Sequence, residues 1–357
     1  MILRFPSAPN SVLPAVLTVA LLALLSSQTA AAEIRNHSIW RDTQGNLIDC
    51  HEGGILRVGD TFYWYGRAYK GHKTGMYGKE GAKFRCGLNV YSSTDLVNWN
   101  CRGVCLSYPA SGFLTAGTWH RPRVLYHSQT GKYVLWFFMF PTGTQYGSTL
   151  VVGTASAPTG PFTVLTGPSF GESGDLALFQ DQDGQSYMAY DDQMRRSIRV
   201  TRLTTDLLNL TRSTTIALQA GGGRVYEGSS MVRYKGKYIV AGSGVAGLNP
   251  TDTTYAVADS PLGPYTYKGL MSQQNTWSSQ ISSFLYLAES DRLIALCEQW
   301  LTGPNGERVP AEQSCQLWLP VTFDPASGAA KMEHVPQWDP WTHAGIAQRL
   351  PLPVASE

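Results

Sequence analysis

A turn followed by an aromatic-rich strand recurs five times in this chain of 357 residues, and this repeat constrains the fold more than any other feature. The turns are spaced by 72, 53, 52 and 55 residues and lie at Gly59, Gly131, Gly184, Gly236 and Asp291. A second turn-bounded strand follows each of the first four turns, and helical periodicity is almost absent. Such repeats predict radial four-stranded blades, so we expect an all-β, five-bladed β-propeller. A β-sandwich, the alternative, would not produce a repeat of this period.

The first 32 residues have a different composition from the rest. Arg4 is their only charge, residues 12–25 form a nearly continuous apolar run, and three alanines precede Glu33. This pattern predicts a secretory signal peptide at 1–32. The alternative, an uncleaved membrane anchor, is disfavoured because the run is shorter than the about 20 residues that span a bilayer. We therefore expect one propeller domain at 33–357, monomeric, free of the membrane, and secreted or periplasmic.

The charge balance limits the class of partner. Lys and Arg number 28 and Asp and Glu 26, a formal net charge of +2, so no basic excess is present to neutralise nucleic-acid phosphates. With 43% hydrophobic residues the chain is also too apolar for a disordered protein.

Six cysteines lie after residue 32, and an even number in an oxidising compartment favours disulfides. The simplest local pairs are Cys101 with Cys105 and Cys297 with Cys315. A zinc site is disfavoured because no C-x-x-C pair occurs.

The propeller geometry brings five distant positions together. Innermost strands line the axis, so residues at their starts should meet at one mouth of the channel. These positions precede their turns by 7, 10, 9, 9 and 11 residues and are Glu52, Arg121, Asp175, Glu227 and Gln280. Partial burial and mutual repulsion should raise the pKa of at least one of the three acids. Two carboxyls in different protonation states are what glycosidic bond cleavage requires, although ion pairing between blades is the structural alternative.

Several motifs occur in order between Trp40 and Trp341 and resemble those of glycoside hydrolase family 43. They are Cys-His-Glu-Gly-Gly-Ile-Leu (50–56), Tyr-Trp-Tyr-Gly (63–66), Tyr-Ser-Ser-Thr-Asp-Leu (91–96), Arg-Pro-Arg-Val (121–124), Gly-Asp-Leu-Ala-Leu-Phe (174–179) and Tyr-Glu-Gly-Ser (226–229). The resemblance implies an inverting exo-glycosidase on a five-bladed propeller, most similar to the exo-β-1,3-galactanases. Arabinofuranosidases, xylosidases and galactofuranosidases of the same family are alternatives, as is a non-catalytic carbohydrate-binding propeller.

The resemblance also implies roles for the converging residues. Glu227 matches the general acid, and Asp175 matches the aspartate that orients the acid and raises its pKa. Glu52 stands where most members have the base aspartate, but the galactanases have glycine there and a glutamine at the place of Gln280. We predict Glu52 as the base, with Gln280 holding water or sugar; the reverse assignment stays open.

The chain departs from the galactanases at Arg67 and His120, where they have acids, and near Leu248, where they have a tryptophan. An anionic sugar substituent bound by Arg67, His120 and Arg121 is one interpretation. We favour a neutral sugar, with these cations paired to Glu52 or Asp175. The other predicted sugar contacts are His51, Tyr226 and Ser279. No cofactor is expected to be required, and a structural calcium ion in the central channel is a further possibility.

Overall fold

The computed structural model describes residues 33–69, 87–109, 112–141, 148–165, 173–192, 196–247 and 249–342. They belong to one compact unit, Ala32–Glu357. The predicted signal peptide, the insertion at 70–85, Cys86 and Leu248 lie outside the described residues. Within the described part, a search for helices that could cross a bilayer found none of sufficient length and hydropathy.

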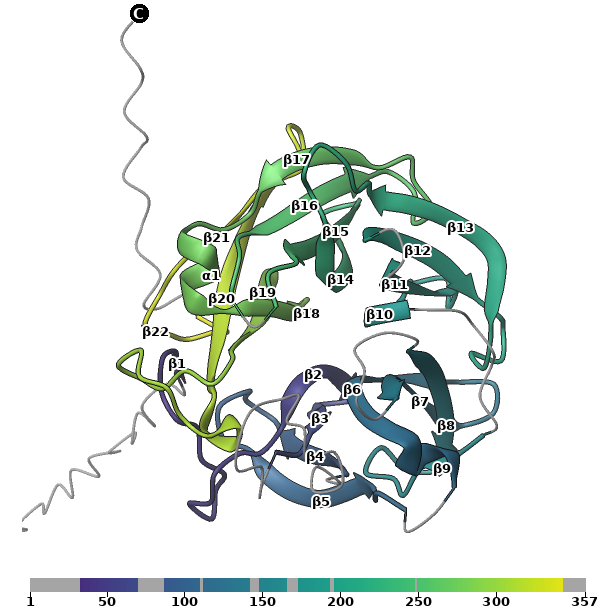
Figure 1. Cartoon of the computed structure of the whole chain (residues 1–357), viewed down its shortest axis with the longest axis vertical. Helices are drawn as coiled ribbons and strands as arrows, with labels where there is room; N and C mark the ends of the chain where they lie inside the picture. The colour runs from purple at the N-terminus through teal and green to yellow at the C-terminus, as the bar shows by residue number, and fades with distance from the viewer. Residues whose placement is uncertain are drawn as a thin grey trace, which may run out of the picture. The chain divides into compact units, whose positions relative to one another are not determined.

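Five four-stranded antiparallel sheets are arranged around a central axis, which confirms the predicted all-β, five-bladed propeller (Figure 1). In chain order, blade 1 has β2 (His51–Val58), β3 (Thr61–Arg67), β4 (Leu88–Ser93) and β5 (Asn100–Leu106). Blade 2 has β6 (Gly117–His127), β7 (Lys132–Pro141), β8 (Thr149–Ala155) and β9 (Thr163–Val164). Blade 3 has β10 (Ser173–Gln180), β11 (Ser186–Asp192), β12 (Ser197–Leu203) and β13 (Leu210–Leu218).

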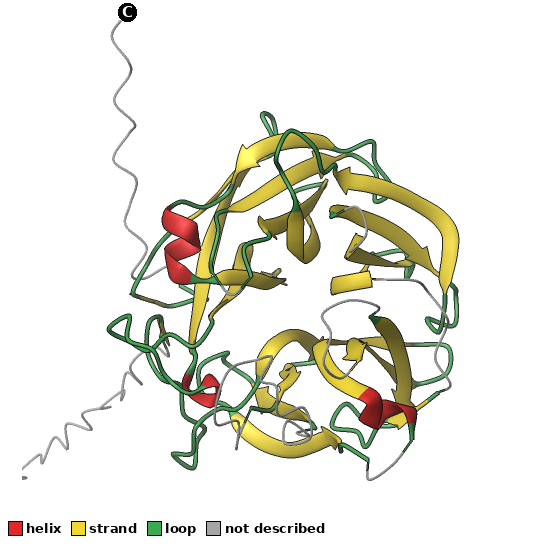
Figure 2. Cartoon of the chain, viewed as in Figure 1, coloured by secondary structure: helices red, strands yellow, loops and turns green. Residues whose placement is uncertain are grey.

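Blade 4 has β14 (Tyr226–Tyr234), β15 (Lys237–Gly244), β16 (Thr253–Ala258) and β17 (Thr266–Leu270), and blade 5 has β18 (Gln280–Leu287), β19 (Arg292–Gln299), β20 (Cys315–Asp324) and β21 (Ala329–Met332). The described chain also has three short helical segments: η1 (Phe113–Ala116), α1 (Gln274–Ser278) and η2 (Ala311–Gln313). Strands dominate the fold in Figure 2.

The five repeated turns join the first and second strand of each blade, as predicted. All five central residues have positive φ, with values of 59° at Gly59, 65° at Gly131, 83° at Gly184, 78° at Gly236 and 45° at Asp291. Glycine adopts this left-handed conformation without steric cost, and aspartate tolerates it better than most residues. The repeat in the sequence is therefore a repeat of hairpin turns.

Each blade packs on the next through its own hydrophobic cluster. The cluster between blades 5 and 1 contains Trp64, Trp99 and Trp318, none more than 2% exposed. Their rings meet edge to face, with centroids 5.2 to 6.0 Å apart. Most aromatic residues of the repeats thus fill blade interfaces, which leaves the axis to the polar residues at the strand starts.

The ring closes through the two ends of the described chain. β1 (Ile34–Arg35) pairs antiparallel with β22 (Gln337–Trp338). The buried Asn36 side chain donates to the carbonyls of Trp318 and Val335, at 2.9 and 2.7 Å, and accepts from the Trp318 N–H at 2.7 Å. One amide therefore fastens the start of the chain to blade 5.

The predicted disulfides are not formed among the described cysteines, which are all free thiols. Cys297 pairs across the sheet with Leu317, and Cys315 with Gln299, so the two cysteines are offset by two residues. Cys101 is exposed whereas Cys105, four residues further along β5, is buried. Two residues that are four positions apart in an extended strand have Cα atoms more than about 7 Å apart, which is the limit that a disulfide tolerates.

Candidate active site

All five innermost strands contain a register shift beside a predicted site residue. The shifts lie at 51–54, 120–123, 173–176, 227–230 and 281–283, in β2, β6, β10, β14 and β18. Glu52, Arg121 and Gly228 have positive φ there, at 59°, 52° and 67°. A β-bulge bends its strand and redirects the side chain next to it. Repeated bulges thus direct one polar residue per blade toward the axis.

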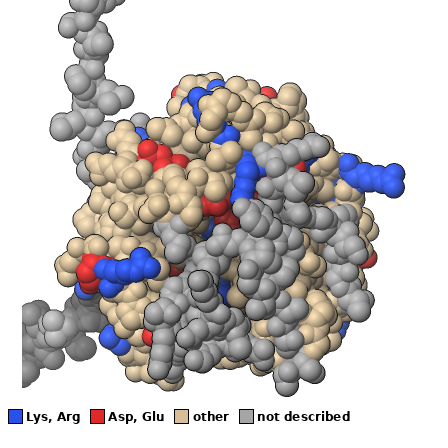
Figure 3. Space-filling model, viewed as in Figure 1, with Lys and Arg blue, Asp and Glu red and all other residues tan. Residues whose placement is uncertain are grey.

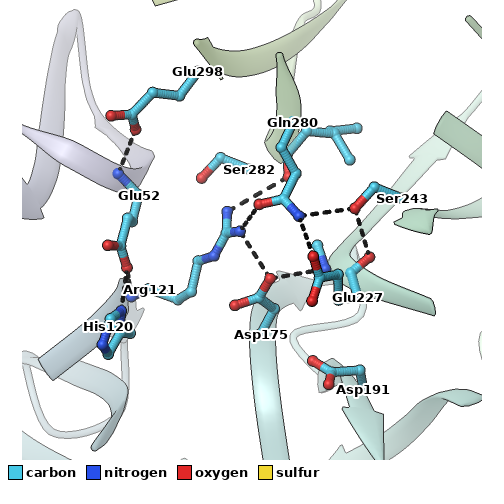
Figure 4. A network of polar contacts seen from close by, with 12 residues as sticks. Glu52, His120, Arg121, Asp175, Asp191, Glu227, Ser243, Gln280, Ser282 and Glu298 are labelled. Carbon is cyan, nitrogen blue, oxygen red and sulfur yellow. Dashed lines mark hydrogen bonds and ion pairs between the residues drawn. The ribbon is translucent and has the colours of Figure 1, made fainter. Parts of the chain in front are cut away.

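Glu227 and Asp175 form a carboxyl pair at the mouth of the channel (Figure 4). The Asp175 Oδ2 atom accepts from the Gly228 N–H, directly after Glu227, at 2.8 Å. Burial, followed by the negative charge of Asp175, raises the pKa of Glu227 to about 7. Near pH 7 this carboxyl is therefore about half protonated and can donate a proton, which agrees with the raised pKa predicted for one of the acids.

Arg121 and Gln280 join the pair into one network. Arg121 Nη2 donates to Asp175 Oδ2 at 2.8 Å and also to Gln280 Oε1. Gln280 Nε2 donates to Glu227 Oε1 at 3.0 Å and to Ser243 Oγ at 2.9 Å. Residues of blades 2, 3, 4 and 5 therefore meet in one polar cluster, and Figure 4 shows them pointing toward one another. We call this cluster of Arg121, Asp175, Glu227, Ser243 and Gln280 the pit. In Figure 3, acidic and basic atoms lie side by side near the centre of this face.

Asp191 is a third acid near the pair that sequence reasoning missed. Its side chain is 1% exposed, and Figure 4 shows it beneath Asp175 and Glu227 in this view. A Cβ on Gly174 would lie 2.3 to 2.6 Å from the Asp191 carboxyl, so only glycine fits in that bulge. Burial, then the charges of Asp175 and Glu227, raises the pKa of Asp191 well above its usual range. Asp191 directly follows Tyr190 in one of the repeated hairpin strands, so nothing in the sequence marked it as a separate candidate for the site.

Trp300 is a second residue that the sequence did not single out. Its indole N–H donates to Gln280 Oε1 at 3.2 Å, and the Arg121 guanidinium lies 5.6 Å from its ring centroid. The ring is half-buried at the edge of the network. An aromatic face beside Gln280 and Arg121 can stack on a sugar ring.

Glu52 lies apart from this pit, although it comes from the equivalent bulge of blade 1. Its carboxylate accepts from Arg67 Nη1 at 3.2 Å, His120 Nδ1 at 2.9 Å, the Arg121 N–H at 3.3 Å and the Tyr69 hydroxyl. Burial alone would raise its pKa, but His120 and then Arg67 outweigh it and hold the pKa well below the usual range. The side chain is 2% exposed. Glu52 is thus an ionised, enclosed carboxylate.

The predicted sugar-contact residues other than Gln280 are buried. His51, Arg67, His120, Arg121, Tyr226 and Ser279 are each at most 3% exposed. His51 bonds Glu298, Tyr226 packs in the cluster between blades 3 and 4, and the Ser279 hydroxyl donates to the Thr276 carbonyl. Direct sugar contact by these side chains stays a prediction. The basic residues pair with Glu52 and Asp175, as expected for a neutral sugar, so no free cation cluster for an anionic substituent is formed by these three residues.

The predicted calcium ion in the central channel stays a prediction. Within the described ranges, no group of three His, Cys, Asp or Glu side chains could hold a metal. A separate cavity of about 560 Å³ opens further along the inner strands, lined by residues such as Leu56, Phe179 and Phe284. Glu52, Arg121, Asp175, Glu227 and Gln280 do not line that cavity and lie toward the other end of these strands.

The model of glycosyl hydrolases family 43 matches residues 49–283, or 235 of 357 residues, and this match includes every residue of the network except Trp300. The chain belongs to glycosyl hydrolase family 43. It is therefore a glycoside hydrolase, and the resemblance found in the sequence is confirmed. The matched region therefore contains Glu227, Asp175, Arg121 and Gln280.

Solved structures of other glycosidases are similar to this family-43 domain. One is the exo-β-1,3-galactanase of Phanerochaete chrysosporium with β-1,3-galactotriose, at 28% identity, a TM-score of 0.72, and coverage of 86% of this chain and 68% of that one. Another is the exo-β-1,3-galactanase of Clostridium thermocellum, at 26% identity, a TM-score of 0.73, and coverage of 90% and 70%.

Two curated relatives are named for a different activity from that of the galactanases. They are the arabinoxylan arabinofuranohydrolases of Paenibacillus polymyxa and Bacillus subtilis, 27% and 26% identical over 51% and 50% of this chain. The matched regions cover 33% and 41% of those proteins, so the chain matches less than half of their length.

Proposed function

We propose that this glycoside hydrolase is an exported, inverting exo-glycosidase that removes terminal sugars from galactan-type polysaccharide. The observation that carries the proposal is that Glu227, which lies beside Asp175, has a pKa raised to about 7. A carboxyl that is protonated near neutral pH can protonate the leaving glycosidic oxygen. The half-buried Trp300 ring offers a stacking face for the sugar beside it.

The galactan substrate is supported by the solved exo-β-1,3-galactanases, whose structures match 86% and 90% of this chain at 28% and 26% identity. The arabinofuranohydrolases match about half of the chain in sequence. The arabinofuranohydrolases nevertheless support arabinofuranoside hydrolysis as a second candidate. Turnover of a β-galactoside and β-1,3-galactan, compared with an arabinofuranoside and a xyloside, separates these substrates. Binding without release of reducing sugar from any of them would indicate a non-catalytic propeller.

We assign Gln280, rather than Glu52, as the residue that holds the attacking water. Every oxygen of the Glu52 carboxylate already accepts two hydrogen bonds, and a carboxylate with a lowered pKa is a weak base. Gln280 is half-buried in the pit and contacts Glu227 directly. In this scheme Glu227 gives its proton to the leaving oxygen as the bond between that oxygen and the anomeric carbon breaks. The water oxygen bonds the anomeric carbon, and the proton that the water loses leaves to solvent. Glu52 then acts as an anchor for Arg67 and His120.

The general-acid role is tested with Glu227→Gln, which keeps the shape of the side chain but has no proton to give. Turnover of β-1,3-galactan should fall by about 10²–10⁴-fold, the usual contribution of a general acid, while the melting temperature stays near that of the wild type. Glu289→Gln, at an exposed carboxylate that pairs with Arg57, is the control and should keep full activity. A folded Glu227→Gln variant with undiminished turnover would refute the assignment.

The water assignment is tested with azide and by the stereochemistry of the product. If Gln280 holds the water, Gln280→Ala lowers kcat, and azide does not restore turnover in a folded Glu52→Gln variant. Azide rescue of Glu52→Gln would identify Glu52 as the base instead. Proton NMR of the first product should show inversion at the anomeric carbon, and retention would exclude direct attack by water.

A further inference from the structure

Two histidines meet where the ring closes, outside the network of the pit. His37 follows β1 and His334 precedes β22, so 297 residues of chain separate them. Their Nε2 atoms are 2.7 Å apart, and the contact is exposed to solvent. The two rings lie edge to face with centroids 5.0 Å apart. Two imidazole nitrogens from opposite ends of the chain therefore point at the same place.

The hydrogen bonds around His37 determine its tautomer. Gln299 is 3% exposed, and its Nε2 donates to the Trp277 carbonyl at 3.1 Å. The Gln299 Oε1 atom is therefore an acceptor, and it lies 3.1 Å from His37 Nδ1. His37 must carry its proton on Nδ1, which leaves a lone pair on Nε2 toward His334. Metal-binding histidines are commonly oriented in this way, through a carbonyl oxygen on the other ring nitrogen.

The ring of His334 is held by stacking. It lies 4.8 Å from the Trp277 ring, at an interplanar angle of 16°. Trp277 belongs to α1, whose residues Asn275, Thr276 and Trp277 all have left-handed backbone angles. Thr276 fixes that turn because its buried hydroxyl donates to the Thr251 carbonyl at 2.8 Å. Both imidazoles are thus oriented by neighbours, the buried Gln299 and the partly buried Trp277, while the contact between their Nε2 atoms is exposed.

We propose that His37 and His334 form an open binding site for a divalent transition-metal ion such as Zn²⁺, with water completing the coordination. Imidazole suits Zn²⁺, Cu²⁺ and Ni²⁺ and not the hard cations Ca²⁺ and Mg²⁺. Zinc–nitrogen bonds of about 2.0–2.1 Å at a tetrahedral angle separate two nitrogens by about 3.3 Å. The two atoms must therefore open by about 0.6 Å, and the exposed His334 side chain has room to do so. The ion takes the place of the shared proton.

The site would fasten the two ends of the propeller. An ion between these rings adds a second link beside the β1–β22 pairing and the Asn36 hydrogen bonds. Because the two histidines are distant in the sequence, the unfolded chain has no such site. An ion that binds only the folded state stabilises it in proportion to its concentration.

Isothermal titration of the untagged, chelator-treated full chain with ZnCl₂ tests the proposal. We expect one ion per chain with a micromolar dissociation constant, and a rise in melting temperature of about 2–4 °C at saturating Zn²⁺. His334→Ala, at an exposed residue, should weaken binding at least tenfold and abolish the rise. CaCl₂ should give neither effect.

The matched control is His127→Ala. His127 lies in blade 2, bonds Thr130 and contacts no other histidine in the described part of the chain, so this variant should bind Zn²⁺ like the wild type. If the wild type binds no zinc at about 100 μM ZnCl₂, which is 100-fold the expected dissociation constant, the proposal is overturned. Equal affinity of His334→Ala and the wild type would overturn it as well. His334→Gln, which keeps a hydrogen-bonding side chain, separates loss of the metal ligand from loss of the local contact.

Discussion

At the scale of single residues, the site depends on how each carboxyl is surrounded. Glu227 is buried beside another acid, whereas Glu52 is buried beside Arg67, His120 and a tyrosine. The sequence predicted that these acids would lie at equivalent positions, and the structure places them in equivalent bulges. It could not predict their opposite pKa shifts, because these depend on neighbours such as His120 and Arg121 from another blade. Asp191 and Trp300 were missed for a related reason, since their roles arise from packing across strands.

The pKa of Glu227 sets the alkaline limb of activity. A general acid must be protonated, so kcat/KM should fall above pH 7, with an apparent pKa of about 7. Asp175→Asn removes the neighbouring negative charge and should move this limb to lower pH, since Arg121 and Arg196 then face Glu227 with less opposition. Initial rates from pH 4 to 9 in both proteins measure the shift. An unmoved limb in Asp175→Asn would show that Glu227 does not control it.

Asp191 should lower stability at neutral pH. Because its folded-state pKa is raised, its favourable contribution is complete below the unfolded pKa of about 3.9 and is lost as pH rises through the folded pKa. Each unit of that difference costs about 1.4 kcal/mol. Asp191→Asn does not titrate, so it should melt higher than the wild type at pH 8, with the difference shrinking toward pH 4. Thermal melts at both values check this, and a lower melting temperature at pH 8 would contradict it.

At the scale of elements, the bulges of the innermost strands decide which residues reach the axis. Alternation along a strand was readable from the sequence, and so were the hairpin turns. A bulge is a relation between two strands, and nothing in the segment Cys-His-Glu-Gly-Gly-Ile-Leu shows where its partner strand shifts register. The same limit applies to α1, whose left-handed residues are Asn, Thr and Trp rather than glycine. These irregular segments adjoin Glu52 and Gln280, which is where strained backbone is expected to gather.

Gly53→Ala tests the bulge of β2. A Cβ at this position would lie 1.8 Å from the Tyr65 carbonyl oxygen, so the strand pair must separate. We expect a loss of several kcal/mol in unfolding free energy, within the range of the largest single substitutions, together with loss of activity. Gly59→Ala, in the turn of the same hairpin, meets no atom within 4 Å and should cost only about 1–2 kcal/mol for its positive φ. Chemical denaturation of both variants compares the two, and equal losses would contradict the steric explanation.

At the scale of the whole molecule, stability requires closing the ring. The sequence predicted the number of blades from the turn spacing, and this was confirmed. It did not predict that the ends close through β1, β22 and Asn36, because these segments lie outside the repeat. The predicted disulfides were wrong among the described cysteines, since strand register places their side chains apart. Closure in this part of the chain therefore relies on hydrogen bonds and packing.

Asn36→Ala should destabilise the protein strongly. It removes three buried hydrogen bonds and leaves the Trp318 N–H and two carbonyls without that partner. At about 1 kcal/mol for each bond, the expected loss in unfolding free energy is about 3 kcal/mol. Asn209→Ala, at an exposed turn, is the matched control and should change stability by less than about 0.5 kcal/mol. Similar denaturation midpoints for the two variants would argue against closure through Asn36.

A crystal structure of the Glu227→Gln variant with β-1,3-galactotriose tests the central claim most directly. We predict the glycosidic oxygen within about 3.2 Å of the side chain at position 227, and the terminal ring against Trp300, Asp175 and Gln280. A sugar seated instead in the cavity beside Leu56 and Phe284, or touching no blade-3 or blade-4 carboxyl, would contradict the claim that these bulges assemble one catalytic pit.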